Sequence, residues 1–307
     1  MKIRNLTYRS IILTLFSISF FLVLSFRDAD QNDSMVSEIE DFIKVHKISE
    51  NVLIITMGYD AITAIATQKG IVVVDAGISN SLTEKYKKVI EREFDRNDFA
   101  YLINTHSHPD HIGGNQVFSN AIIVGHENCL SEISNQWKDP EKIKPRLLKI
   151  VEEYDSELKN CEPGSDEWKS VFCQKVRYQS AYNDLLDGQV ITNPNVTFTD
   201  SLSIFMGDAT FNLIYFGKAH SNSDIFIHIP EAKILMSGDL FFPGGRPSVY
   251  EVSEKDAQRW VYVMDWIKNR DDEIDIIIGG HGQIMDKKDL EAFNKSIILK
   301  KLELVTK

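Results

Sequence analysis

The chain has 307 residues, of which 43% are hydrophobic and 26% are charged, and its formal net charge is −11. These proportions are ordinary for a globular protein, and the length is sufficient for one large core or two closely packed sheets. The negative charge argues against a nucleic-acid partner, because affinity for a phosphate backbone is built mainly on Lys and Arg.

The beginning of the chain is typical of an export signal. Three basic residues lead into an apolar run, and no acidic residue precedes the end of that run. We expect residues 1–26 to be a signal peptide or a membrane anchor, residues 27–37 to be a linker, and residues 38–307 to form one folded domain. The protein is then exported to the periplasm or the extracellular space, or is anchored in the membrane by residues 10–26.

Three short runs rich in β-branched residues predict the first sheet, namely residues 51–57, 61–67 and 71–75. The next segment contains Ser81-Leu82-Thr83-Glu84, which has the pattern of a capping box at a helix N-terminus. Apolar residues follow at helical spacing. We therefore expect a helix that covers the sheet with Leu82, Tyr86, Val89 and Ile90.

The most informative segment, Asn104 to Gly114, follows the apolar run 100–103 and holds three histidines and a carboxylate within six positions. Such a cluster is typical of a metal site. If the run is a strand, His106 and His108 point the same way and can converge on one ion. A turn at Pro109 would aim Asp110 and His111 elsewhere, so two metals are conceivable. Gly113-Gly114 either lets the backbone approach the site closely or forms an ordinary turn.

Between residues 127 and 187 the composition changes to stretches rich in Lys, Glu and Leu. Residues 142–158 and 167–186 predict two helices separated by Pro163-Gly164. This helical insertion either walls the site and sets substrate size, or forms an outer packing or dimer element. The three cysteines lie in or beside it and are not spaced like zinc ligands. In an exported protein, Cys161 and Cys173 could pair and leave Cys129 free.

Three further polar residues follow apolar runs that predict strands in the second half of the chain. His220 follows residues 211–216, Asp239 follows residues 234–238, and His281 follows residues 276–280. Between the last two, a segment starting at Ser253 predicts a helix with a buried stripe of Trp260, Val263, Met264 and Ile267. The remaining histidines, His46, His126 and His228, lie in or beside strand-like runs and are interpreted as structural.

The ordered set of histidines and aspartates resembles the metallo-β-lactamase-fold hydrolase superfamily, over roughly residues 40 to 300. The resemblance implies an α+β fold, a four-layer αββα sandwich with a helical insertion, in which residues 38–307 are the catalytic domain. It implies that one zinc ion is held by His106, His108 and His220. It implies that a second is held by Asp110, His111 and His281, with Asp239 as the bridge. The early strand ending at Asp75 also resembles the family, which makes Asp75 the candidate partner of a ligand histidine; as an alternative, Asp75 simply starts a turn before Gly77.

Three features select a branch of this superfamily. β-Lactamases that hydrolyse carbapenems carry a cysteine where this chain has Asp239, whereas lactonases, glyoxalase II, sulfatases and tRNA-processing relatives carry an aspartate. Flavodiiron relatives have a glutamate in place of the second histidine, here His108, and persulfide dioxygenases lack a complete second site. The resemblance therefore implies a dinuclear zinc site, with iron or manganese as alternative metals.

The expected reaction is hydrolysis of a small-molecule carbonyl substrate, with an ester or lactone favoured. Zinc lowers the pKa of bound water to about 7, so a hydroxide that bridges the metals and is oriented by Asp110 and Asp239 would be the nucleophile. The alternatives are β-lactam or thioester hydrolysis, an iron-dependent oxidation, or a non-catalytic scaffold that docks a partner. A serine triad is a poor competitor because the chain has no GxSxG motif.

The loop from Phe241 to Tyr250 follows the bridging aspartate and is expected beside the site. In it, Arg246 could hold a substrate carboxylate and Tyr250 could donate a proton to an oxyanion. Both side chains could equally be solvated.

Overall fold

In this computed structural model the described residues are 39–243, 246–247, 254–286 and 288–293. The chain divides into two compact units, Met1–Ile43 and Lys44–Lys307, and all elements named below belong to the second. The expected signal or anchor, the linker and Tyr250 lie outside the described residues. Within the described part of the chain, no helix is long and apolar enough to cross a membrane.

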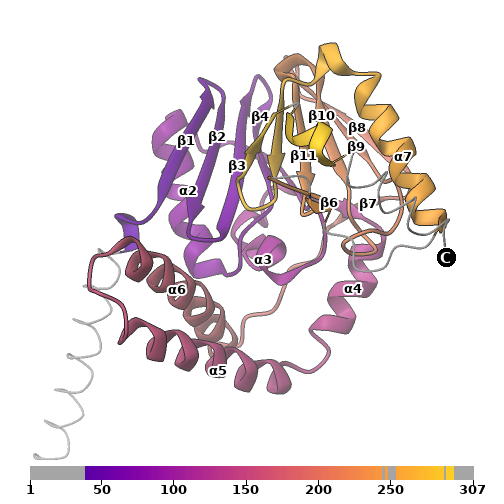
Figure 1. Ribbon diagram of the computed structural model, residues 1–307. Coiled ribbons are helices and arrows are strands. Elements are labelled where there is room, and N and C mark those ends of the chain that lie inside the picture. Colours follow the sequence, from indigo (N-terminus) through magenta and orange to yellow (C-terminus); the bar gives the residue numbers. More distant parts are fainter. Residues whose placement is uncertain (1–38, 244–245, 248–253, 287, 294–307) are drawn as a thin grey trace, which may run out of the picture. The chain divides into compact units, whose positions relative to one another are not determined.

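The first sheet has seven strands in the order β1 to β7 (Figure 1). The first four strands are antiparallel to their neighbours, and β4 to β7 run parallel. The bounds are β1 Lys44–Ser49, β2 Val52–Met57, β3 Asp60–Thr67, β4 Gly70–Val74, β5 Phe99–Ile103, β6 Ile122–His126 and β7 Val196–Phe198. The three β-branched runs are thus confirmed as β2, β3 and β4. Because β4 and β5 are parallel, the residues after them leave the sheet at the same edge.

The second sheet has six strands in the order β15-β14-β11-β10-β9-β8. Strands β11 and β14 are parallel, so the chain leaves both at one edge of this sheet as well. The bounds are β8 Ser201–Phe205, β9 Thr210–Ile214, β10 Phe226–Ile229, β11 Ile234–Gly238, β14 Ile276–Gly279 and β15 Ile284–Met285. A two-stranded ribbon, β12 Phe241–Phe242 and β13 Arg246–Pro247, follows β11.

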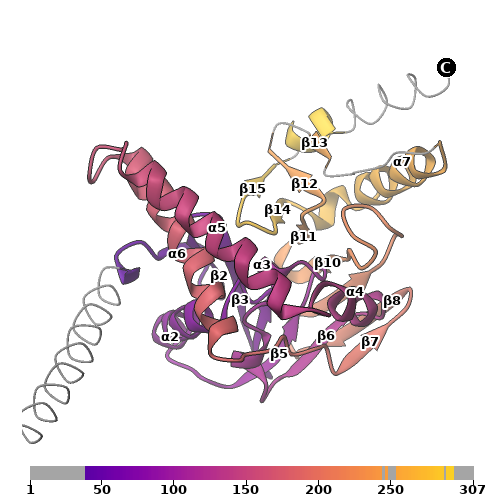
Figure 2. The same ribbon diagram turned by 90° about the horizontal axis from the view of Figure 1, so that it is seen from below.

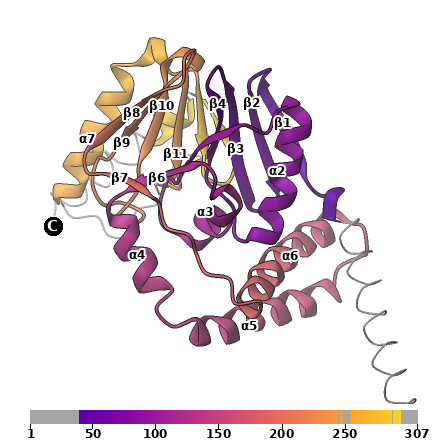
Figure 3. The ribbon, with the colours of Figure 1, turned by 180° about the vertical axis from the view of Figure 1, so that it is seen from behind.

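The two sheets pack face to face and helices cover their outer faces (Figures 1 and 3). The core between the sheets joins Val72 and Ile103 of the first sheet to Leu213 and Ile227 of the second. Helix α2, Asn80–Phe94, covers the first sheet, and α7, Glu254–Lys268, covers the second. The expected four-layer αββα sandwich is confirmed. The stripe on α7 is confirmed too, with these residues buried: Trp260, Val263, Met264 and Ile267.

The N-terminus of α2 differs from the sequence-based expectation. The capping residue is Ser79, whose hydroxyl accepts a hydrogen bond from the backbone N–H of Leu82 at 3.2 Å. Ser79 has the extended backbone that a cap requires, whereas Ser81 already lies inside the helix. The expected capping box at Ser81 is therefore wrong by two positions. The buried face is as predicted, with Leu82, Tyr86, Val89 and Ile90.

The helical insertion consists of α4, Asn128–Gln136, α5, Pro140–Leu158, and α6, Asp166–Leu186. Helices α5 and α6 form a hairpin across Pro163-Gly164, which confirms the two predicted helices. Seen from below, α5 crosses the short helix α3, Pro109–Ile112, which lies at the sheet edge described above (Figure 2). The insertion therefore lies over the segment that carries the histidine cluster.

The three cysteines are buried free thiols. Cys161, just after α5, donates to the carbonyl of Glu157, whereas Cys173 on α6 packs against Gly58. The expected pairing of Cys161 with Cys173 is absent because the two side chains face different neighbours. Burial raises the pKa of Cys129 to about 12, although its hydrogen bond to Ser223 acts in the opposite direction. This thiol is thus kept in its unreactive, protonated form.

Candidate metal centre

The seven candidate ligands come from separate stretches of the chain and meet at one edge of the two sheets. His106 and His108 follow β5, Asp110 and His111 lie in α3, and the other three follow β9, β11 and β14. Their ligand atoms form three overlapping groups in which all atoms lie within 4.8 Å of one another. The groups are His106/His108/His220, His106/His111/Asp239 and Asp110/His111/His281.

The first group consists of three imidazoles. His220 Nε2 lies 2.9 Å from His108 Nδ1, and the ring centres of His106 and His220 are 5.0 Å apart at nearly a right angle. His106 Nε2 is buried without a hydrogen-bond partner among the described residues. Three ring nitrogens converging in this way form the donor set of a tetrahedral zinc site with its fourth position free.

Asp239 links the group of three histidines to the group of Asp110, His111 and His281. The Oδ2 atom of Asp239 lies 3.5 Å from His220 Nε2 and 3.1 Å from His281 Nε2. Its Oδ1 atom lies 3.6 Å from His111 Nε2, which is itself 3.9 Å from Asp110 Oδ1. His281 is held from its other side, where Nδ1 lies 2.7 Å from the Tyr59 carbonyl. Asp239 therefore reaches both the three-histidine group and the group that contains Asp110.

Asp75 contacts His111 directly and is linked to His106 through Thr105. Its Oδ2 lies 2.8 Å from His111 Nδ1 and also accepts the Thr105 hydroxyl at 2.8 Å, while its Oδ1 accepts the Thr105 backbone N–H at 2.7 Å. The Thr105 hydroxyl is in turn 3.1 Å from His106 Nδ1. A carboxylate on the far nitrogen of a ligand histidine fixes its tautomer and leaves the other nitrogen free for a metal. Asp75 thus contacts His111, and its role as the partner of a ligand histidine stays a prediction.

Nine buried side-chain polar atoms lack hydrogen-bond partners within the described ranges, and three of them lie together in this cluster: His106 Nε2, His111 Nε2 and Asp239 Oδ1. Buried polar atoms normally have partners, so a group of three requires an explanation. Imidazole nitrogens and a carboxylate oxygen are zinc ligands, and the second donor of each imidazole is already occupied by a fixed polar neighbour. The residues present therefore fit a metal.

The electrostatics of the cluster favour the ligand forms of His106, His220 and Asp239. They do not favour that of His111: burial alone would lower its pKa, but Asp239, Asp75 and Asp110 outweigh burial and raise that pKa well above its usual value. Burial lowers the pKa of His220 to about 4, and burial likewise holds the pKa of His106 well below its usual value. Burial alone would raise the pKa of Asp239, but His111 and His281 outweigh it and hold that pKa far below the usual range. Neutral imidazoles and an ionised carboxylate are the forms that bind metals.

A buried ion pair, which sequence analysis missed, joins the insertion to this cluster. Arg177 on α6 is 3% exposed; its Nε lies 3.6 Å from Asp60 Oδ1, and its Nη2 lies 3.4 Å from Asp110 Oδ2. Tyr86 donates to the other oxygen of Asp60 at 2.9 Å. The sequence held one signal: Arg177 lies four positions from Cys173 and four from Ala181, so it shares the helical face of these apolar residues, where a charge needs a buried partner.

A second missed residue, Glu132 on α4, ties together the two histidine-bearing loops. Its Oε2 accepts the hydroxyls of Ser107 at 2.7 Å and Ser223 at 2.5 Å, and its Oε1 accepts the Asn222 N–H at 2.8 Å. Ser107 stands between His106 and His108, and the other two follow His220. Glu132 thus fixes the relative positions of three candidate ligands. Its sequence neighbourhood is an ordinary polar helix.

The glycines near the cluster allow close packing. A Cβ at Gly113 or Gly114 would overlap the carbonyls of Ile78 and Ala76, so this pair packs on the loop after β4 rather than against the ligands. Gly280, which sequence analysis did not single out, is the glycine at the site. A Cβ there would overlap Asp239 Oδ1 and crowd His111.

A cavity of about 700 Å³ opens between this cluster and the insertion. It is lined by the candidate ligands His108 and Asp110, by the loop after β4, and by α4, α5 and α6. The lining residues are Ile78, His108, Pro109, Asp110, Gln136, Trp137, Ile143, Arg146, Leu147, Ile150, Tyr178 and Ala181. The expectation that the insertion walls the site agrees with this position.

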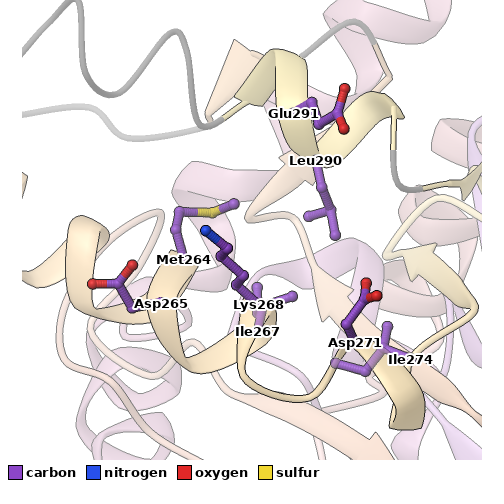
Figure 4. Close-up of a pocket in the computed structure, with 8 residues that line it drawn as sticks. All are labelled: Met264, Asp265, Ile267, Lys268, Asp271, Ile274, Leu290 and Glu291. Carbon is purple, nitrogen blue, oxygen red and sulfur yellow. The ribbon is translucent and has the colours of Figure 1, made fainter.

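A second cavity, about 640 Å³, lies on the α7 side of the second sheet (Figure 4). Its lining carries three acidic side chains, Asp265, Asp271 and Glu291, beside Lys268. None of its eight described lining residues is a histidine or cysteine. It therefore lacks the donor set of the first cavity.

Of the two predicted substrate contacts, Arg246 lies in strand β13 and Tyr250 lies outside the described residues, so both roles stay predictions.

Comparison with known proteins places these observations in a family. A family model described as the metallo-beta-lactamase superfamily matches residues 58–281. The chain is 23% identical over 253 residues to a metallo-beta-lactamase type 2 of Bacillus sp. (strain 170), covering 80% of this chain and 78% of that protein. It is 22% identical, with the same coverage, to the metallo-beta-lactamase type 2 of Bacillus cereus.

Solved structures share the fold. The metallo-beta-lactamase from Pontibacter korlensis superposes with a TM-score of 0.55 at 16% identity, covering 83% of this chain and 99% of that chain. A double mutant of the sec-alkyl sulfatase PisA1 superposes with a TM-score of 0.57 at 15% identity, covering 86% of this chain and 43% of that one. At such identities these likenesses establish the fold alone.

Proposed function

The chain belongs to the metallo-β-lactamase superfamily of hydrolases, and on this premise we propose that it is a dinuclear zinc hydrolase of carboxylic esters or lactones. The observation that carries the proposal is the position of Asp239, whose two oxygens face both ligand groups. An aspartate at this position is what the resemblance associates with lactonases and related hydrolases rather than with carbapenem-hydrolysing β-lactamases.

In this proposal one zinc is held by His106, His108 and His220, and a second by Asp110, His111 and His281, with Asp239 shared. Zinc ions bound there would lower the pKa of a water to near neutrality and polarise a substrate carbonyl. The chain supplies neutral imidazoles at the first group, because burial holds the pKa values of His106 and His220 low. It supplies negative charge at the shared position through Asp239.

Asp110 is the residue that we assign to proton movement. Burial would raise its pKa, but His111, His281 and Arg177 outweigh burial and keep the carboxyl ionised. Its Oδ2 is held by Arg177 at 3.4 Å, and the residue lines the cavity. An ionised carboxylate facing the substrate can accept a proton from the attacking water and return it to the leaving alkoxide.

The test is metal content combined with turnover. The chain, purified without added metal, is analysed by plasma mass spectrometry and assayed on a small ester, a lactone, a thioester and the β-lactam nitrocefin. About two zinc ions per chain with chelator-sensitive ester or lactone turnover supports the proposal. One iron per chain with oxygen uptake and no hydrolysis contradicts it in favour of an oxidative enzyme.

β-Lactam hydrolysis is the second candidate, supported by the names of the curated relatives. In that case nitrocefin turnover would exceed ester and lactone turnover in the zinc-loaded protein. Replacing Asp239 with cysteine tests the choice, because it restores the ligand that the resemblance associates with carbapenem hydrolysis. We expect Asp239→Cys to lower ester turnover and to raise the ratio of nitrocefin turnover to ester turnover.

We also propose that the protein is exported, on the basis of the basic and apolar pattern of residues 1–26. Cell fractionation and N-terminal sequencing of the isolated protein test this. Cytoplasmic protein with an intact N-terminus would contradict export.

A further inference from the structure

We infer that the cavity between the metal centre and the helical insertion binds an apolar substituent of the substrate. The substrate class would then be esters or lactones that carry a sizeable hydrocarbon or aromatic group. This inference rests on the proposed function. It deepens that proposal by assigning a role to the insertion, whose α5 and α6 helices bear none of the candidate ligands.

The α5 wall of the cavity is mainly apolar because its apolar residues recur at helical spacing, and Arg146 is the one charged α5 residue in the lining. Ile143, Leu147 and Ile150 lie four and three positions apart on α5, so they share one face of the helix, and all three line the cavity. Each is only partly buried. Their neighbour Leu148 points away and is 37% exposed. This face of α5 has apolar surface still to bury.

Aromatic side chains close the sides of the same space. Trp137 at the end of α4 and Tyr178 on α6 both line the cavity, and Ile78 from the loop after β4 faces them. Small-molecule sites are concave, have volumes of roughly 300 to 1,000 Å³, and are lined mostly by apolar and aromatic side chains with a few polar groups. The volume of about 700 Å³ and this lining match that description.

The position of the cavity identifies its occupant as part of the substrate. His108 and Asp110, one from each proposed zinc site, line it together with the α5 residues. A carbonyl that reacts at the metal centre therefore has its substituents at the mouth of this cavity. The Arg177 bridge to Asp60 and Asp110 holds α6 against the site, so the wall is fixed relative to the reacting atoms.

The experiment uses two series of straight-chain esters with the zinc-loaded full chain. One series lengthens the acyl group, the other lengthens the alcohol, and each rate is divided by that of base-catalysed hydrolysis. We expect kcat/KM to rise by about fourfold per methylene in one series, the factor that corresponds to burying one CH₂. The rise should end when the cavity is full. Length-independent kcat/KM in both series would overturn the inference.

Three variants locate the effect. Leu147→Trp fills the cavity and should abolish the rise with chain length, and its zinc content and urea denaturation midpoint report whether the protein is folded. Ile143→Ala enlarges the cavity and should move the plateau to longer chains. Leu148→Trp, on the exposed face of the same helix, is the matched control and should behave as wild type. If neither cavity variant alters the length dependence, the apolar group binds elsewhere and the inference is wrong.

Binding without turnover separates this inference from the proposed function. Straight-chain carboxylates and alcohols, the two halves of these esters, are titrated by calorimetry. If one series binds more tightly with length in wild type but not in Leu147→Trp, the cavity assignment holds even if no ester is hydrolysed. If esters are hydrolysed but neither titration depends on length, the proposed function holds and the cavity assignment fails.

Discussion

The two sides of the site are built differently. The floor, defined as the seven candidate ligands with Asp75, comes from loops at strand ends and from α3 and is rich in fixed polar contacts. The wall, defined as α4 to α6, presents mainly apolar side chains. All seven candidate ligands lie outside the insertion, whereas the apolar side chains that line the cavity lie largely on it. We therefore assign chemistry to the floor and selectivity to the wall.

The largest expected effect is the loss of the shared ligand. Asp239→Ala removes the carboxylate that reaches both ligand groups, so we expect the metal content to fall and turnover to drop to that of the chelator-treated wild type. The control is Asp275→Ala. Asp275 lies just before the start of β14, at the end away from His281, and its side chain is 55% exposed. Full turnover with two metals bound in Asp239→Ala would show that the floor is not the metal centre.

The contact between wall and floor gives the next largest effect. Arg177→Gln leaves the Asp60 carboxylate buried without its cation, which costs about 3–5 kcal/mol in the free energy of unfolding. Urea denaturation measures it, and Asp60→Asn in the same chain should recover much of the loss. Lys175, like Arg177, lies on α6; Lys175→Gln breaks a more exposed pair with Asp155 of α5 and should cost less than about 1 kcal/mol. Equal denaturation midpoints for both single variants would refute the role of Arg177.

Acid should destabilise the floor of the metal-free protein. His220 has a folded-state pKa of about 4 and an unfolded value of 6.5, so its contribution to stability is present above pH 6.5 and is lost as the pH falls towards 4. The full difference is at most on the order of 3 kcal/mol. Denaturation of chelator-treated wild type and His220→Asn across this range measures it. Parallel stability profiles for the two proteins would contradict the assignment.

The smallest effect is expected at Asp75, the carboxylate that contacts the candidate ligand His111. Asp75→Asn should lower metal affinity by about 10- to 100-fold, the usual cost of altering a hydrogen bond to a ligand histidine. Asp75 has a φ of 59°, which Asn tolerates, so the backbone is not the cause. Asp95 has a φ of 50° at the end of α2, and Asp95→Asn is the matched control. An unchanged zinc affinity in Asp75→Asn would exclude this role.

The floor was predictable because its residues follow strand-like runs directly. A strand fixes where its next residues emerge, so His106, Asp239 and His281 could be placed at sheet edges without knowing the whole fold. Asp75, after β4, was instead implied by the resemblance of its strand to the family. Sequence reasoning failed at Ser79, because the sequence offers two serines and only the extended backbone selects the capping residue.

The wall was predictable only as two helices. How the hairpin docks depends on contacts between segments far apart in the sequence, such as Arg177 with Asp60 and Ser180 with Ser79. Neither pair has a local signature. The bridge from Glu132 to Ser107 and Ser223 has the same origin. The lack of a disulfide between Cys161 and Cys173 also follows from the docking of α6, which turns Cys173 towards Gly58.

The most direct test of the central claim is a crystal structure of the zinc-loaded protein with anomalous data at the zinc absorption edge. The account predicts two anomalous peaks, one among His106, His108 and His220 and one among Asp110, His111 and His281. Each should lie about 2.0–2.2 Å from its ligand atoms and beside Asp239. A single peak, or zinc bound away from this cluster, would contradict a dinuclear centre at the edge of the two sheets.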